Sequence, residues 1–166
     1  ATSGPGATNL LTGICCSFYD SVPTLFITGQ VSTFRMVGKT GVRQVGFQVT
    51  PIVDVVESVT KYAVTIDDPK NIRYELEKAV AIARSGRPGP VLVDIPDNFQ
   101  REFVDVKVLG AYEKTVRVNN APSEVSDIKK STIESVLRCI ENSDRPVIIA
   151  GWGVRLSDTN EETIRF

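Results

Sequence analysis

The sequence has no histidine and only three cysteines among its 166 residues. Without histidine, the chain cannot build a Ser-His-Asp or Cys-His catalytic site, or a Cys/His zinc site, from its own residues. Cys15 and Cys16 are adjacent, Cys139 lies far along the chain, and no Cys-x-x-Cys pair occurs. We therefore expect the cysteines to be small buried apolar residues of a cytoplasmic protein, and no metal ligands.

An excess of positive charge is also missing. Nineteen Lys and Arg oppose twenty Asp and Glu, for a net charge of −1. Binding to nucleic acid or to a membrane surface would favour a clustered basic excess, so neither partner is expected. No apolar run approaches the roughly 20 residues of a membrane span, and no signal-peptide pattern opens the chain.

The first hundred residues alternate between apolar runs and helical patterns. Residues 23–29 and 91–95 are continuous apolar runs, which are typical of strands buried on both faces of a parallel sheet. Further elements are predicted as a helix at 10–18, a long loop at 30–48, a helix at 51–58 capped by Thr50, a strand at 62–66 and a helix from Asp68-Pro69 to Ser85-Gly86. This order predicts an α/β fold, a three-layer doubly wound parallel sheet.

The pattern changes near residue 102. Residues 102–122 lack a helical period and are predicted to be an interdomain linker. A helix at 123–142 and a strand at 146–151 follow, and then the turn Gly151-Trp152-Gly153. We expect a partial domain at 1–101, the linker at 102–122, and the beginning of a second α/β domain at 123–166.

The turn Gly4-Pro5-Gly6 precedes the first predicted helix. Glycine tolerates positive φ and close approach, and a helix N-terminus can seat a polar ligand. From the residues alone, Thr2 and Asn9 could instead cap this helix, and Gln48 could be a solvated loop residue. A dinucleotide-binding turn fits poorly, because Asn9 takes the third glycine position and Gln30 stands where an acidic ribose ligand is wanted.

Six motifs together resemble one family, the thiamine-diphosphate enzymes of the acetolactate synthase type. In order, they are Thr2-Ser-Gly-Pro-Gly-Ala-Thr-Asn9, Asp20-Ser-Val-Pro23, Ile27-Thr-Gly-Gln-Val31, Gly46-Phe-Gln48, Val59-Thr-Lys61 and Gly86-Arg-Pro-Gly-Pro-Val-Leu-Val-Asp-Ile-Pro96. The resemblance places residues 1–101 in the later part of the pyrimidine-binding domain. It places residues 123–166 at the opening of the central domain.

This resemblance implies thiamine diphosphate and magnesium as cofactors of the full-length enzyme. It implies decarboxylation and carboligation of pyruvate-type 2-oxo acids in branched-chain amino acid biosynthesis, and association into dimers or tetramers. Thr2, Pro5 and Asn9 match positions that line the cofactor pocket, and Gln48 matches a glutamine that supports catalysis there. The family's activating glutamate would lie upstream of Ala1, and its Gly-Asp-Gly magnesium motif in a third domain, so the chain alone is expected to be inactive.

Some residues depart from the family pattern. Val49 follows Gln48 where acetolactate synthases usually have glutamate, and residues 41–46 replace a Gly-Thr-Asp-Ala stretch. Two alternative interpretations therefore remain. The chain could belong to another 2-oxo acid decarboxylase or carboligase of the same family, or to a non-catalytic binding or assembly module derived from it. Gly151, Trp152 and Gly153 match a turn near the flavin of FAD-dependent members, but the bulky Trp152 disfavours FAD.

Overall fold

The computed structural model describes residues 1–113 and 130–166. The chain divides into two compact units, Ala1–Ala121 and Pro122–Phe166. Residues 114–122 of the predicted linker, and residues 123–129 of the predicted helix that follows it, lie outside the described residues. The domain assignment made from the sequence therefore stays a prediction.

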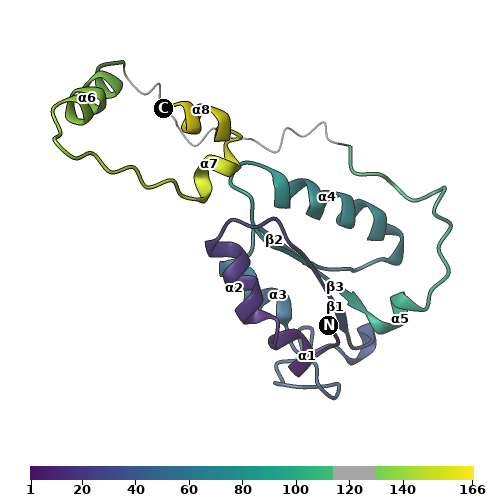
Figure 1. Ribbon diagram of the computed structural model, residues 1–166. Coiled ribbons are helices and arrows are strands. Elements are labelled where there is room, and N and C mark those ends of the chain that lie inside the picture. Colours follow the sequence, from purple (N-terminus) through teal and green to yellow (C-terminus); the bar gives the residue numbers. More distant parts are fainter. Residues whose placement is uncertain (114–129) are drawn as a thin grey trace. The chain divides into compact units, whose positions relative to one another are not determined.

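The first unit contains a parallel sheet with three strands, β1 (Leu25–Gln30), β2 (Tyr62–Thr65) and β3 (Val91–Pro96). Their spatial order is β1-β3-β2, so the last strand lies between the other two (Figure 1). Leu25 and Tyr62 both pair with Val91 at the start of β3. The three predicted strands and their parallel arrangement are confirmed.

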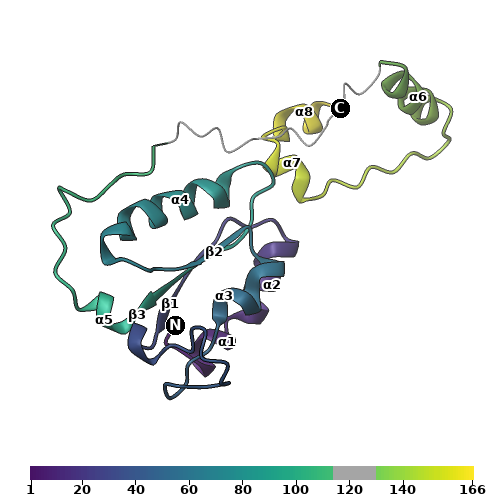
Figure 2. The ribbon, with the colours of Figure 1, turned by 180° about the vertical axis from the view of Figure 1, so that it is seen from behind.

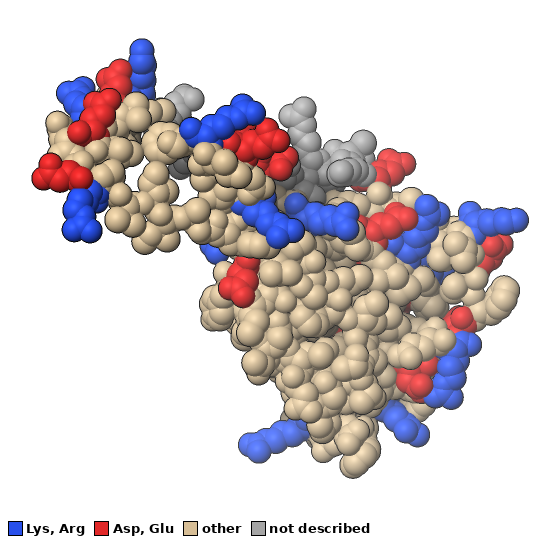
Figure 3. All heavy atoms as spheres, in the orientation of Figure 1, with Lys and Arg blue, Asp and Glu red and all other residues tan. Residues whose placement is uncertain are grey.

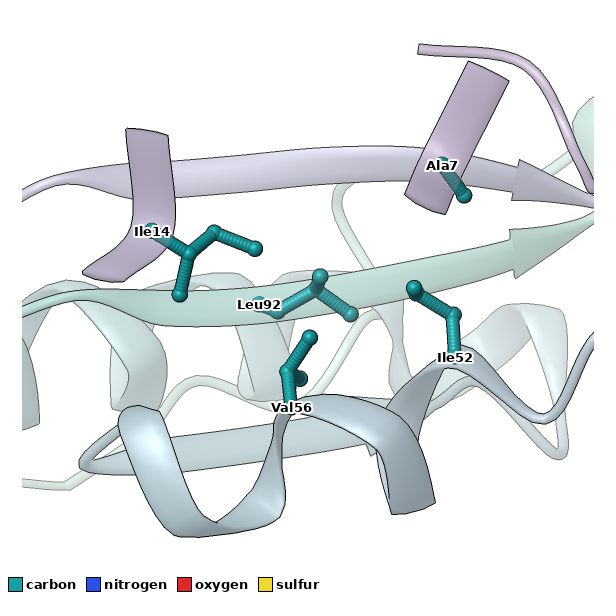
Figure 4. Packing of buried hydrophobic residues seen from close by; sticks show 5 residues of the cluster. All are labelled: Ala7, Ile14, Ile52, Val56 and Leu92. Atoms are coloured by element: carbon teal, nitrogen blue, oxygen red, sulfur yellow. The ribbon is translucent and has the colours of Figure 1, made fainter. Parts of the chain in front are cut away.

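Helices cover both faces of this sheet. Leu92 points toward α1 (Pro5–Thr8), α2 (Leu11–Tyr19) and α3 (Ile52–Val56), where it packs with Ala7, Ile14, Ile52 and Val56 (Figure 4). Val91 and Val93 point the other way, because side chains alternate along a strand, and pack with Ala79 and Ala83 of α4 (Ile72–Arg84). The views in Figures 1 and 2 show the same three layers, as the sequence predicted.

Several helix ends follow the sequence signals and one does not. Asp68 accepts a hydrogen bond from the Lys70 N–H at 2.8 Å, and Gly86 takes a φ of 50° just after α4. Thr50 is not the cap of α3; Pro51 is, without a side-chain cap bond. The carbonyl oxygen of Thr50 instead accepts hydrogen bonds from Ile52 N–H and from the Gln30 side chain.

The chain after β3 turns through α5 (Asp97–Gln100) and then follows α4. Leu109 is buried, and the Tyr112 N–H donates to Glu77 at 2.8 Å. The rings of Tyr112 and Tyr74 meet edge to face, 5.4 Å apart. The described part of the predicted linker thus makes specific contacts with a helix of the first unit.

The expectation of buried cysteines is wrong, because none of the three is fully buried. Cys15 is half-buried, but Cys16 and Cys139 are exposed. In α2 the buried residue is Ile14, and Cys16 lies two positions further, on the opposite side of the helix.

The second unit contains α6 (Lys130–Glu141), α7 (Trp152–Leu156) and α8 (Asn160–Arg165). The described part of the predicted 123–142 helix is confirmed. The predicted strand at 146–151 is wrong, because the described residues offer this stretch no neighbouring strand to pair with. Its side chains are open to solvent, with Val147 84% and Ile149 90% exposed.

Charged side chains of both signs share the surface shown in Figure 3. On α4, for example, Arg73 pairs with Glu77 at 2.8 Å, and Lys78 lies 3.7 Å from Glu75. The Arg73–Glu77 pair is accessible to solvent and contributes little to stability. Among the described helices, none has both the length and the apolar character needed to cross a bilayer.

Because Leu92 is fully buried in the central strand, Leu92→Ala should lower the free energy of unfolding by about 2–5 kcal/mol. Val55→Ala, on the exposed side of α3, is the control and should change it by less than about 0.5 kcal/mol. Urea unfolding followed by circular dichroism measures both. Equal effects would contradict the assignment of Leu92 to the core.

Candidate functional site

A cleft of about 790 Å³ lies at the carboxyl ends of β1 and β3. Open parallel sheets bind their ligands at this end of the strands. Its walls come from the N-terminal residues, the end of β1, the first residues of the loop that follows it, and α5, including Thr2, Ser32, Arg35, Asp97 and Gln100. Of the predicted site residues, Thr2 lines this cleft.

The N-terminal residues lie along the outer edge of β1. The amino group of Ala1 donates to the carbonyl oxygen of Ile27, and the Gly29 N–H donates to the Ala1 carbonyl, each at 2.8 Å. This strand-like pairing fixes the direction of the chain as it enters the Gly4-Pro5-Gly6 turn. It also places Thr2 at the cleft.

The turn brings Thr2 and Gln48 onto the same short piece of backbone. A Cβ on Gly4 would lie 2.7 Å from both the Cβ and the carbonyl oxygen of Gln48, and one on Gly6 would lie 2.6 Å from the Thr2 Cγ2. Gly4 also has a φ of 59°, which favours glycine. Gln48 therefore lies against Gly4, and Thr2 against Gly6, because neither glycine has a side chain.

Pro5 and Asn9 lie at the two ends of α1, and both are exposed. The cap of α1 is Gly4 and that of α2 is Leu10, neither with a side-chain bond, so Thr2 and Asn9 are not N-caps. The helix after the turn has only four residues, which weakens the helix-dipole argument made from the sequence. The structure brings Thr2 and Gln48 to the turn and leaves Asn9 at the far end of α1; their roles toward a cofactor stay predictions.

The loop that carries Gln48 is attached to the body of the unit. The Ser32 hydroxyl donates to Asp97 at 3.2 Å, and the Thr33 N–H donates to the Asn98 side chain at 2.9 Å. Further along, the Gly46 N–H donates to the Arg35 carbonyl at 2.9 Å. Gln48 itself is exposed and has a φ of 59°, an uncommon conformation for a residue other than glycine.

A buried carboxylate that was not predicted from the sequence lies beneath this site. Asp94 is 0% exposed and accepts hydrogen bonds from Thr28 at 2.6 Å, Gln30 at 2.9 Å and Thr65 at 3.3 Å. Burial raises the pKa of Asp94, and the three hydrogen bonds offset part of that rise. The signal was present: a single acidic residue inside the apolar run 91–95.

The remaining predicted residues belong to the second unit. Gly151 precedes α7, and the Arg155 guanidinium lies 4.9 Å from the centre of the Trp152 ring. A role of this turn in binding FAD stays a prediction. Among the described residues, no group of three or more His, Cys, Asp or Glu side chains could hold a metal ion.

Comparison with known proteins links the whole chain to one kind of enzyme. No family model matches it. It is 39% identical over 167 residues to acetolactate synthase 2, chloroplastic, of Nicotiana tabacum, an alignment covering 100% of this chain and 23% of that protein. It is 41% identical to acetolactate synthase, chloroplastic, of Arabidopsis thaliana, covering 92% of this chain and 22% of the relative.

A third relative is acetolactate synthase 1, chloroplastic, of Zea mays, 39% identical over 170 residues and again matched over 100% of this chain. This chain spans 24% of that protein's length, so it corresponds to about a quarter of such an enzyme. The names of these relatives place them in chloroplasts. They contradict the expectation of a cytoplasmic location, which had rested on cysteine usage.

Because Gly4 has positive φ and no room for a Cβ, Gly4→Ala should lower the free energy of unfolding by about 1–3 kcal/mol. Gly13→Ala is the control. Gly13 lies inside α2 with no heavy atom within 4 Å of its added Cβ, so this change should stabilise by about 0.5–1 kcal/mol. Thermal or urea unfolding gives both values, and a neutral Gly4→Ala would show that the turn is not constrained.

Asp94→Asn tests the buried carboxylate through pH. A raised folded-state pKa means that the folded protein binds more protons, so the stability that Asp94 contributes is fully present below its ordinary pKa of 3.8. That contribution is lost as the pH rises through the higher folded pKa. The stability of the wild type relative to Asp94→Asn, measured by urea unfolding at a series of pH values, should therefore fall over this window. A rise with pH would contradict the assignment.

Proposed function

We propose that this chain, which is homologous over its whole length to one segment of the acetolactate synthases, forms part of a thiamine-diphosphate-dependent enzyme acting on 2-oxo acids. The observation that carries the proposal is the 39% identity to the tobacco enzyme over 100% of the chain. The relatives support this activity better than a dinucleotide-dependent oxidoreductase.

In such an enzyme the cofactor supplies a nucleophilic carbon and then an electron sink for decarboxylation of a 2-oxo acid. The part of this chain is to bind and orient. Gln48 would present a neutral amide, which donates and accepts hydrogen bonds without exchanging protons at neutral pH. Thr2 would offer its hydroxyl, and Pro5 and Asn9 would contribute further to the wall of the pocket.

Polar groups of the first unit gather at the N-terminal turn and at the adjoining cleft. Gln48 lies against the turn at Gly4 and Thr2 lies against it at Gly6, in the space that a Cβ would need. The adjoining cleft holds hydroxyl, amide and guanidinium groups from Ser32, Gln100 and Arg35. By resemblance, the diphosphate and its magnesium ion would be held by other parts of the enzyme, and the chain alone would have no turnover.

Exposed strand edges support self-association. β1 and β2 are the outer strands of the sheet, and β1 is paired on its outer side with Ala1. Ile27 on that edge is 47% exposed. Apolar surface at a sheet edge favours contact with another chain, and we propose that copies of the protein associate as the resemblance implies.

The substrate could differ from that of the relatives. Val49 and residues 41–46 depart from the acetolactate synthase pattern within the loop that carries Gln48. Another decarboxylase or carboligase of 2-oxo acids is therefore the second candidate. A non-catalytic module has no observation in its favour beyond these departures.

A chimeric enzyme tests the proposal. The segment of the tobacco acetolactate synthase that aligns with this chain is replaced by the chain, and acetolactate formation from pyruvate is measured at saturating thiamine diphosphate. Gln48→Ala in the chimera should lower kcat about 10- to 100-fold, because a hydrogen bond to the reacting species is lost. Cofactor affinity should change much less. Lys39→Ala, an exposed change in the same loop, is the control.

Folding of each chimera is checked by circular dichroism and cofactor binding by calorimetry. A folded chimera that binds thiamine diphosphate but decarboxylates no 2-oxo acid would contradict the proposed function. Decarboxylation of pyruvate without acetolactate formation would favour the second candidate. If Gln48→Ala weakened cofactor binding and left kcat unchanged, Gln48 would be a wall of the pocket only.

A further inference from the structure

One buried side chain connects the two ends of the long loop between β1 and α3. Gln30, the last residue of β1, is almost fully buried. Its Nε2 donates to the carbonyl oxygen of Thr50 at 2.7 Å and to Asp94 Oδ2 at 2.9 Å. Its Oε1 accepts a hydrogen bond from the Val31 N–H at 3.0 Å.

The backbone partners of Gln30 stand at opposite ends of the loop. Val31 is the first residue after β1, and Thr50 lies just before α3. The cost in chain entropy of bringing two ends together increases with the length of the loop. A single amide that binds both ends in a buried site offsets this cost at the base of the loop.

Asp94 keeps the amide of Gln30 in place. Its carboxylate is bound by hydroxyls from both neighbouring strands, Thr28 on β1 and Thr65 on β2. Parallel pairing holds these strands in register, with Thr28 and Thr65 both opposite Asp94. The sheet thus fixes the carboxylate that accepts a hydrogen bond from Gln30. Because the same amide also donates to Thr50, it holds that end of the loop in a fixed position relative to the sheet.

We propose that Gln30 is a positioning residue. It closes the 31–50 loop at its base and thereby holds Gln48 in its position against Gly4. The loop has other attachments, at Ser32 and Thr33 to α5 and at Gly46 to Arg35. The bonds of Ser32 and Thr33 fix the first residues of the loop, and the bond from Gly46 to Arg35 holds two segments of the loop together. Among the bonds of the described loop, the one from Gln30 to Thr50 fixes the returning end, two residues from Gln48.

The competing explanation is that Gln30 only fills a polar space in the core. In that case its loss would weaken the sheet and the loop together. The positioning role predicts local opening instead, because the sheet keeps its own ladder of backbone bonds. The hydrogen bonds of Gln30 and the closure of the loop are properties of the fold. Only the role of the positioned Gln48 in catalysis rests on the proposed function.

Amide hydrogen exchange on the whole 166-residue chain, without cofactor or substrate, separates the two. Gln30→Met keeps the length of the side chain and removes the amide. It should speed exchange of Val31 and of the protected amides in 32–50 about tenfold or more, while the amides of β1 and β3 stay protected. Gln100→Met is the matched control, since it removes an exposed side-chain amide that donates to the Ile95 carbonyl and has no hydrogen bond to the 31–50 loop.

Three results would overturn the proposal. They are an unchanged loop in Gln30→Met, the same loop opening in Gln100→Met, or loss of protection in the strands and loop together. If Gln30→Met does not fold, Gln30→Asn is measured instead, because its shorter amide keeps a polar group but cannot reach both Thr50 and Asp94. Loss of strand protection in Gln30→Asn as well would make Gln30 a core residue. Since no ligand is used, failure here leaves the chimera experiment unaffected.

Discussion

Every layer of the first unit is built on β3. Leu92 closes the core under α1, α2 and α3, while Val91 and Val93 close the one under α4. Asp94 continues the side of Leu92 to the carboxyl end, where the apolar core gives way to hydrogen bonds from both neighbouring strands. The central strand thus supplies packing along most of its length and a fixed polar anchor next to the cleft.

The candidate site is assembled from chain segments that this anchor and two glycines bring together. Ala1 pairs with the edge of β1, which directs the N-terminal turn across the carboxyl end of the sheet. Gly4 then leaves space for Gln48, and Gln30 ties the returning loop to Asp94. The proposed function assigns the cofactor contacts of Thr2 and Gln48 to this turn.

The sequence predicted the sheet and α4 well because apolar runs and capping residues act locally. It failed at 146–151, since a strand exists only when another strand pairs with it, and β-rich composition cannot supply one. The sequence also did not predict the buried Asp94 or the hydrogen bonds from Gln30 to Thr50 and Asp94, because both depend on which strands become neighbours. The motif match pointed to Thr2 and Gln48, but only the fold shows that both lie on one glycine turn.

The contact between Gly4 and Gln48 is the point on which the account of the site depends. Nuclear Overhauser spectroscopy of the 166-residue chain can observe it directly, through the α-protons of Gly4 and the β-protons of Gln48. The 2.7 Å separation between an added Gly4 Cβ and the Gln48 Cβ predicts a strong cross-peak. A spectrum with assigned resonances for both residues and no such cross-peak would show that the loop does not seat Gln48 on the turn, and would contradict the account.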